Sequence, residues 1–149
     1  MSHIATVILE ILKVNAGVIA IIGDRIYPDG LPYTSDNPPT LPALVIVHVS
    51  GTPDNEVSDF SIDRVQVSCF SNPQEVNGVA SPLEVEQLAQ AVKDALHIPD
   101  LKKSPLSQTV SGVSHHIFQI RMTGERRYRE SGTGFYHKPL DFMVSYRKD

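Results

Sequence analysis

Five of the eleven prolines of this 149-residue chain fall between Pro28 and Pro42. Proline fixes φ and has no N–H to donate, so such a stretch can form neither a helix nor a central strand. Residues 28–42 are therefore expected to form a long Pro-rich loop. The loop divides the chain into an apolar N-terminal part and a longer part rich in β-branched residues.

The residues before the loop have the spacing of two short helices. Five apolar residues at helical spacing predict an amphipathic helix over residues 3–13. Asn15 can cap a second helix over residues 16–22, which Gly23 can end in a left-handed conformation. The junction Gly23-Asp24-Arg25-Ile26-Tyr27-Pro28 then reads as a helix stop followed by a short extended segment. We expect Asp24 and Arg25 to hold this exit by local hydrogen bonds. The five apolar residues of the first helix are Ile4, Val7, Ile8, Ile11 and Leu12.

Three later segments read as strands. Residues 43–49 are apolar at alternate positions on both faces, which predicts a strand covered on both sides. In residues 64–71, Val65, Val67 and Cys69 point one way. The last strand is the clearest, because alternate apolar residues predict one buried face. That face consists of Leu140, Phe142, Val144 and Tyr146.

Between these strands lies a predicted helix with a strong start signal. Ser81-Pro82-Leu83-Glu84 offers an N-cap serine, a proline at the first helical position and a glutamate that can close a capping box. Residues 108–113 and 114–123 are either two strands or one bent strand. The order helix, helix, strands, helix, strands predicts a single α+β domain, residues 1–149, with an antiparallel or mixed β-sheet and helices packed on one face. The apolar stripe of the central helix is Val85, Leu88, Ala89, Val92, Ala95 and Leu96.

Composition limits the class of protein. A chain of this length suits one domain with a core of its own, and 41% hydrophobic with 20% charged residues indicates a globular chain. A single cysteine allows no internal disulfide, which fits a reducing compartment. No apolar run approaches the roughly 20 residues that span a bilayer. The N-terminus lacks the basic start of a signal peptide, so no membrane association is expected.

No cofactor, metal or catalytic residue is predicted. The six histidines show no ligand spacing, and the adjacent His115 and His116 would point to opposite faces of a strand. Gly132-Thr133-Gly134 lacks the strand, third glycine and helix of a phosphate-binding loop, so a hairpin turn is the better interpretation. Cys69 is expected to be a buried structural thiol rather than a nucleophile.

The densest charge cluster lies in a second predicted loop, residues 124–134. Arg126, Arg127 and Arg129 surround a tyrosine and are flanked by two glutamates. Three interpretations stay open: a solvated hairpin, a protein–protein contact in which Arg and Tyr act as anchors, and contact with nucleic-acid phosphates.

Charge is unevenly distributed along the chain. The net charge is −4; residues 1–101 carry 4 basic and 13 acidic side chains, a balance of −9, and residues 102–149 carry 9 and 4, a balance of +5. This pattern is either ordinary surface decoration or the mark of a subunit with an acidic and a basic side. A two-sided subunit could meet copies of itself head to tail and close into a ring.

Taken in order, these segments resemble the tail-completion (tail-terminator, head–tail joining) proteins of long-tailed bacteriophages and prophages. The resemblance covers nearly the full chain, and the order and spacing of its short motifs carry it. Those motifs are the junction Gly23–Pro28, Leu41-Pro42-Ala43-Leu44-Val45-Ile46-Val47, Ser50-Gly51, Asp63-Arg64-Val65-Gln66-Val67-Ser68-Cys69, the central helix 84–96, and the closing Tyr136, Leu140-Asp141-Phe142 and Tyr146-Arg147.

The resemblance implies a structural virion protein, not an enzyme. It implies a ring, commonly hexameric, at the head-proximal end of the tail tube, where the subunit contacts its own copies, the tail-tube protein and the head connector. DNA would pass through the ring without specific binding. The protein would occupy the host bacterial cytoplasm during assembly. The residues predicted to contact partners are Arg126, Arg127, Arg129, Tyr33 and Asp36. Two alternatives from other classes stay open: a small ligand-binding or enzymatic α+β domain, and a nucleic-acid-binding module.

Overall fold

The computed structural model describes residues 2–32, 37–51, 58–98 and 106–149. Its main feature is a mixed seven-stranded sheet in the order β1-β2-β3-β9-β7-β6, with β8 paired to β9. Among the strand pairs of these described residues, only β1–β2 is parallel. The elements are α1 (His3–Lys13), α2 (Ala16–Ile22), β1 (Ile26–Pro28), β2 (Ala43–Ser50), β3 (Ser58–Ser71), β4 (Gln74–Val76), β5 (Val79–Ser81), α3 (Leu83–Ala95), β6 (Leu106–Val110), β7 (Val113–Glu125), β8 (Tyr128–Arg129) and β9 (Tyr136–Lys148).

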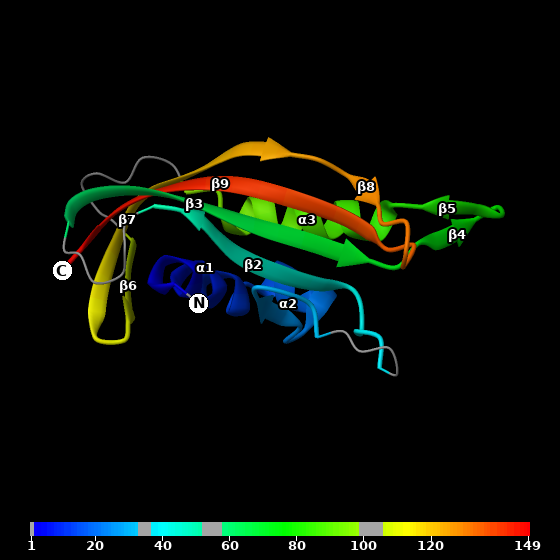
Figure 1. Ribbon diagram of the computed structural model, residues 1–149, viewed down its shortest axis with the longest axis horizontal. Helices are drawn as coiled ribbons and strands as arrows, with labels where there is room; N and C mark the ends of the chain where they lie inside the picture. The colour runs from blue at the N-terminus through cyan, green and yellow to red at the C-terminus, as the bar shows by residue number, and fades with distance from the viewer. Residues whose placement is uncertain (1, 33–36, 52–57, 99–105) are drawn as a thin grey trace.

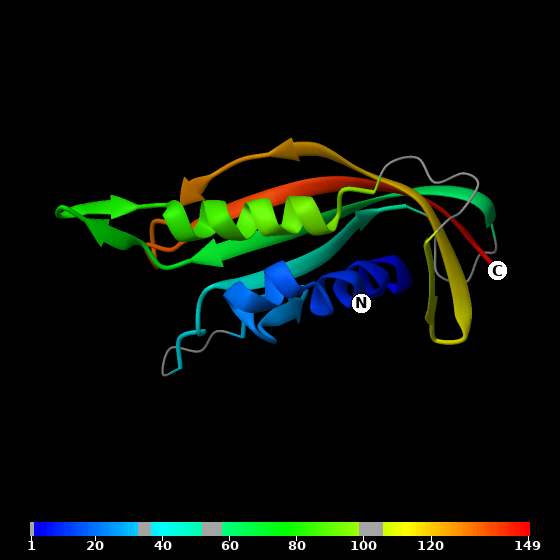
Figure 2. The same cartoon turned by 180° about the vertical axis from the view of Figure 1, so that it is seen from behind.

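All three helices pack on one face of the sheet, as Figures 1 and 2 show from opposite sides. The core consists of the apolar stripes of the helices and the inward residues of β2, β3, β7 and β9. The predicted α+β class, with helices on one face, is therefore confirmed. The predicted inward residues of β9 are all buried: Leu140, Phe142, Val144 and Tyr146.

The N-terminal junction has the helix cap, the helix stop and the hydrogen-bonding arginine that its sequence predicts, whereas the role of Asp24 stays a prediction. The Asn15 side chain accepts a hydrogen bond from the N–H of Val18 at 3.1 Å and caps α2. Gly23 ends α2 with φ +61°. Arg25 donates from Nε to the carbonyl of Pro42 at 2.8 Å and from Nη2 to Ile21 at 3.4 Å, so it ties the helix exit to the start of β2. In the Pro-rich segment 28–42, Pro28 ends β1, and the described residues 29–32 and 37–42 form no helix or strand.

The two-sided covering predicted for the strand over residues 43–49 is confirmed in its first half, where Ala43 and Val45 are also buried, and is wrong in its second half. Leu44 and Ile46 are fully buried, but on the opposite face Val47 is only half-buried and Val49 is 45% exposed. The helices cover a single face of the sheet, so the outer face of β2 opens to solvent toward its end. The valines there reflect the preference of β-branched residues for extended backbone rather than burial.

The strand predicted over residues 64–71 begins six residues earlier, at Ser58. The extension was hidden because its alternation is reversed: Phe60 and Ile62 are exposed, whereas Ser61 and Asp63 are buried. Asp63 accepts a hydrogen bond from His48 at 2.8 Å, which offsets the free-energy cost of burying the Asp63 side chain. A strand that buries its polar residues gives no periodic apolar signal.

The start of helix α3 differs from the capping box predicted for it. Helix α3 begins at Leu83 with Pro82 at the N-cap position, and no side chain caps it. Ser81 instead ends β5 and accepts a hydrogen bond from Leu83 N–H at 3.3 Å, so the predicted capping box is not formed.

Residues 106–125 form two strands rather than one bent strand. The turn between them places Ser111 and Gly112 at φ +52° and +78°.

Candidate partner-contact site

The predicted charged loop 124–134 is more regular than its sequence indicates. Glu125 ends β7, and Tyr128–Arg129 form β8, which pairs with β9. Tyr128 also packs edge-on against the ring of His137 at 4.7 Å between centroids, and Phe70 stacks on the other side at 4.2 Å. Desolvation by these neighbours lowers the pKa of His137, although Glu130, 3.3 Å away, acts in the opposite direction.

The three arginines of this segment lie in different environments. Arg127 donates to Glu86 of α3 at 2.9 Å. Arg129 donates from Nε to the carbonyl of Gly134 at 3.0 Å and lies 5.8 Å from the ring centre of Tyr136. Arg126 is exposed, and only its backbone N–H, bonded to the carbonyl of Pro139, has a recorded partner in the described structure. Arg126 is thus the arginine most available to a partner. Tyr33 and Asp36 lie outside the described residues.

A network of ion pairs joins this segment to the body of the domain. Lys138 of β9 is buried and lies 2.7 Å from Glu86 and 3.4 Å from Glu125. Glu125 in turn pairs with Lys93 of α3 at 2.9 Å. The five members, which we call the Lys138 network, are Lys93, Glu125, Lys138, Glu86 and Arg127.

Electrostatics in the Lys138 network favours the charged forms. Burial opposes the charge on Lys138, but hydrogen bonds and the charges of Glu86 and Glu125 outweigh it and raise the pKa of the amine. Burial likewise opposes the charge on Glu86, yet Lys138 and Arg127 lower the pKa of its carboxyl group. The hydrogen bond from Lys93 is the main cause that lowers the pKa of Glu125. Sequence reasoning missed this network, since Glu86 and Lys138 lie 52 positions apart and meet only in the fold.

The network also bears on the uneven charge of the chain. Arg127 and Lys138, from the basic part, pair with Glu86 of the acidic part. Arg64 of the acidic part pairs with Asp141 of the basic part at 3.1 Å, in the opposite sense. In the large sheet β9 lies beside β3, so the strands of the two parts of the chain meet at one boundary, with β1, β2 and β3 on one side and β9, β7 and β6 on the other. The ion pair between Arg64 and Asp141 crosses this boundary, while the sheet keeps the strands of the acidic part and those of the basic part on opposite sides of it.

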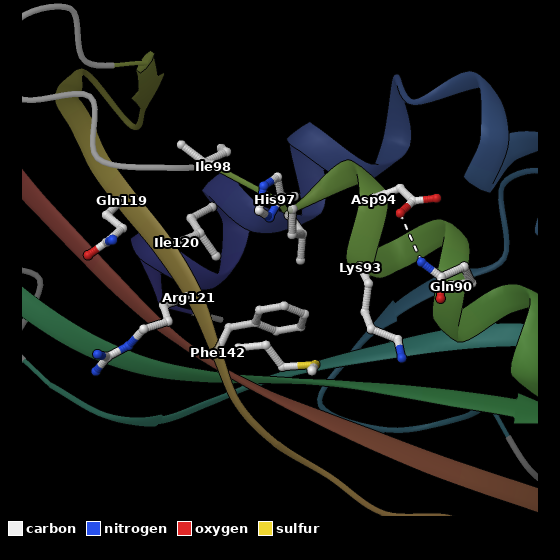
Figure 3. Close-up of a pocket in the computed structure, with 11 residues that line it drawn as sticks. Gln90, Lys93, Asp94, His97, Ile98, Gln119, Ile120, Arg121 and Phe142 are labelled. Atoms are coloured by element: carbon white, nitrogen blue, oxygen red, sulfur yellow. Dashed lines mark hydrogen bonds between the residues drawn. The ribbon is translucent and has the colours of Figure 1, made fainter.

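A pocket of about 490 Å³ lies between the C-terminal half of α3 and β7. Figure 3 shows Phe142 between Lys93 of α3 and Ile120 of β7. His97 also lines the pocket, and Asp94 there accepts a hydrogen bond from Gln90 at 2.9 Å, whereas the side chain of Arg121 points away from the pocket (Figure 3). The lining is thus apolar at the centre and polar around it.

The remaining residues considered for chemistry are Cys69 and the adjacent histidines His115 and His116. Cys69 is fully buried, and desolvation raises the pKa of its thiol far above the ordinary range. His115 is buried, whereas His116 faces the other way and lies 2.8 Å from Asp149. Within the described ranges, no group of three His, Cys, Asp or Glu side chains is placed to hold a metal ion. In the same ranges no single helix is long and apolar enough to cross a membrane; α1 and α2 meet the length and composition test only as a pair bent by 86°.

A family model described as "Tail completion protein gp17" matches residues 6–147. This chain belongs to that family. The resemblance seen in the sequence is thereby confirmed, and the chain is a bacteriophage tail completion protein, a structural virion protein in the broad sense.

Solved structures share the fold of this tail completion protein. One is a chain of the "Virion of native gene transfer agent (GTA) particle", with a TM-score of 0.64 over 94% of this chain and 91% of that chain. The two are 14% identical, so the likeness shows a common fold. No curated protein matches the chain.

Proposed function

We propose that this tail completion protein forms a hexameric ring that caps the tail tube and joins it to the head connector. The match of the family model over residues 6–147 carries the proposal. In this role the protein has no catalytic task. It sits at the head-proximal end of the tail in the finished particle and in the bacterial cytoplasm while the tail is built. DNA passes through the ring without sequence-specific contact.

Features of the subunit support an assembly role. Apolar side chains on the outer face of the sheet are exposed, including Phe60 at 60% and Ile62 at 48%. Exposed apolar surface on a sheet face is typical of protein–protein contact. The charged segment after β7 adds Arg126, whose side chain points to no recorded partner in the described part of the chain. We therefore assign Arg126, together with Arg127, Arg129, Tyr33 and Asp36, to contacts with neighbouring proteins of the tail.

Ring formation and capping can be tested together. The purified protein is examined by light scattering and negative-stain imaging, alone and with the tail-tube protein of the same phage. We expect rings, either in isolation or on tube ends, and tubes that stop growing when the protein is added. A stable monomer at high concentration, which forms no ring even with tube protein and leaves tube growth unchanged, contradicts the proposal.

The same preparation separates the proposal from a nucleic-acid-binding role. A structural ring protein is expected to show weak DNA binding that does not depend on Arg126. Salt-dependent binding at micromolar protein that is lost in Arg126→Ala and Arg127→Ala would favour direct DNA contact instead.

A further inference from the structure

Strand β6 forms one edge of the seven-stranded sheet, in a hairpin with β7 that turns away from the long strands at one end of the domain (Figures 1 and 2). The turn of this hairpin consists of residues 111–112, both at positive φ. In such a tight hairpin the flanking pair, here Val110 and Val113, is hydrogen-bonded, and hydrogen-bonded pairs alternate along the strands from there. The backbone N–H and C=O groups of Ser107 and Thr109 therefore point away from β7.

The outer edge of β6 is open in the described part of the chain. Ser107 and Thr109 are exposed, and the described residues provide no hydrogen-bond acceptor for the N–H of either one. Natural proteins usually protect such an edge with a charge, a proline or a bulge. The sequence of β6, Leu106-Ser107-Gln108-Thr109-Val110, has no charge or proline, and its register with β7 is unbroken. This edge is therefore able to pair with another strand.

The sequence of β6 favours a second copy of the same strand as its partner. From either end it presents an apolar residue, a hydroxyl, an amide, a hydroxyl and an apolar residue. An antiparallel pair centred on Gln108 places Ser107 opposite Thr109 of the partner subunit, and Leu106 opposite Val110 of the partner subunit. Each cross-strand pair then joins side chains of the same kind, and no like charges face each other.

The same register uses the open backbone groups of the edge. Ser107 and Thr109 of the partner subunit exchange two N–H···O=C bonds, as hydrogen-bonded pairs of antiparallel strands do, and the symmetric pair exchanges two more. Leu106, which is 39% exposed, is covered in part by Val110 of the partner subunit. The two sheets are thereby joined into one across a two-fold axis.

The opposite edge of the sheet does not accept β6 in the same way. That edge is formed by β1, whose Pro28 has no N–H and whose Ile26 N–H bonds the carbonyl of Asp24 at 2.8 Å. The part of β2 beyond β1 is interrupted by a register shift between His48 and Ser50. A contact between two β6 edges closes at two copies, so it is distinct from the rotational contacts that build a ring.

We propose that two copies of this protein pair through their β6 strands, antiparallel and centred on Gln108, in a dimer of the free protein. The contact is small, so the dimer is weak and depends on protein concentration. It covers a sheet edge that is otherwise open to non-specific pairing. This inference does not depend on the proposed ring.

Two substitutions at one position test the backbone pairing. Thr109→Pro removes an N–H that points away from β7, so the hydrogen bonds within the hairpin stay intact, whereas Thr109→Ala keeps this N–H. Sedimentation equilibrium of the full chain, without tail-tube protein, should show a concentration-dependent dimer for wild type and Thr109→Ala. The dimer of Thr109→Pro should be weaker by roughly tenfold or more, because each copy loses a donor. Circular dichroism checks that both variants are folded. A wild-type protein that stays monomeric at the highest concentration reached, or a folded Thr109→Pro that dimerises as tightly as Thr109→Ala, overturns the inference.

A single cysteine tests the register independently of the proline. In the proposed dimer residue 108 lies opposite its own copy, at the Cα separation of about 4.5 Å of a non-hydrogen-bonded pair, which a disulfide can bridge. Mild oxidation of Gln108→Cys should therefore give a disulfide-linked dimer. Val14→Cys, at a 76% exposed valine outside β6, reports accidental collisions, and Cys69 is fully buried. Equal linkage of the two variants overturns the inference. Preferential linkage of Gln108→Cys supports it whether or not the protein forms rings on tube ends.

Discussion

At the residue scale, Lys138 shows how a buried charge is tolerated in this domain. Its amine lies between Glu86 and Glu125, which outweigh the cost of burial. A buried cation that is paired in this way stabilises its surroundings only while the partners remain. The exposed pair of Arg64 and Asp141, 3.1 Å apart on the outer side of the sheet, gives a natural comparison.

Replacing Lys138 by methionine should therefore cost more than replacing Arg64. Lys138→Met leaves two carboxylates near each other without their shared partner, and we expect a loss of about 1–2 kcal/mol in the free energy of unfolding. Arg64→Met removes an exposed ion pair and should change the free energy of unfolding by no more than about 0.5 kcal/mol. Denaturant unfolding of both variants provides the measurement. Equal losses would show that Lys138 is no more important than a surface charge.

The same network predicts the behaviour of the protein in acid. Lowered pKa values of Glu86 and Glu125 mean that their contribution to stability is present above the ordinary carboxyl pKa of about 4.5. That contribution is lost as the pH falls through the lower, folded-state pKa. The stability difference between wild type and Glu86→Gln should then shrink as the pH drops from neutral to about 3.

Thermal unfolding across this pH range measures the difference. Glu75→Gln serves as the control, because Glu75 is exposed on the β4–β5 hairpin and has no ion pair in the described structure. That variant should follow the wild-type profile. A Glu86→Gln curve that runs parallel to wild type at all pH values would contradict the assignment.

At the element scale, α2 and α3 differ in whether a side chain accepts a hydrogen bond from the backbone N–H groups of the first helical turn. Asn15 caps α2 directly, whereas Ser81 stands one residue outside the N-cap position of α3. The difference follows from β5: Ser81 is its last residue and pairs with Gln74. Ser81, which the sequence pattern assigns to the N-cap of α3, is therefore part of the β4–β5 hairpin instead.

This difference can be measured with two alanine substitutions. Asn15→Ala removes a capping hydrogen bond and should cost about 1 kcal/mol in the free energy of unfolding. Ser81→Ala removes only an exposed contact with the N–H of Leu83 and should cost less than about 0.5 kcal/mol. Chemical denaturation distinguishes the two. A larger loss for Ser81→Ala would restore the capping box predicted from the sequence.

At the scale of the whole molecule, β3 and β9 hold the domain together. They pair antiparallel from Ser58–Lys148 to Ser71–Tyr136 in the middle of the sheet, and Cys69 lies on the buried face of this pair. Because the thiol is covered by the core on every side, solvent reaches it only when the packing of the whole domain opens.

Cys69 should therefore report global unfolding. In native protein its reaction with a soluble thiol reagent should be slow, both because the thiol is buried and because its pKa is raised. The rate should increase about tenfold for each 1.4 kcal/mol of stability lost, so Lys138→Met should react faster than wild type. Absorbance of the released thiolate dye gives the rate. Labelling of the native protein at the rate of an unfolded peptide would contradict the buried position.

The sequence by itself determined the local elements of this protein. Helical spacing identified α1, α2 and the stripe of α3, and strict alternation identified β9, because these patterns arise from the geometry of each element alone. The ordered motifs also identified the family. The β4–β5 hairpin was not predicted, because its strands of three residues are too short to give a periodic pattern.

Only the tertiary structure decided which elements meet. The packing of α3 against β9 brings Glu86 to Lys138, and the pairing of β3 with β9 joins the acidic and basic parts of the chain. Burial of Asp63 depends on His48 from a neighbouring strand, so no local pattern could reveal the true start of β3. The pocket beside α3 likewise exists only where a helix end and a distant strand come together. Contacts between residues far apart in the sequence leave no periodic signal, and they emerge when the chain packs around one core.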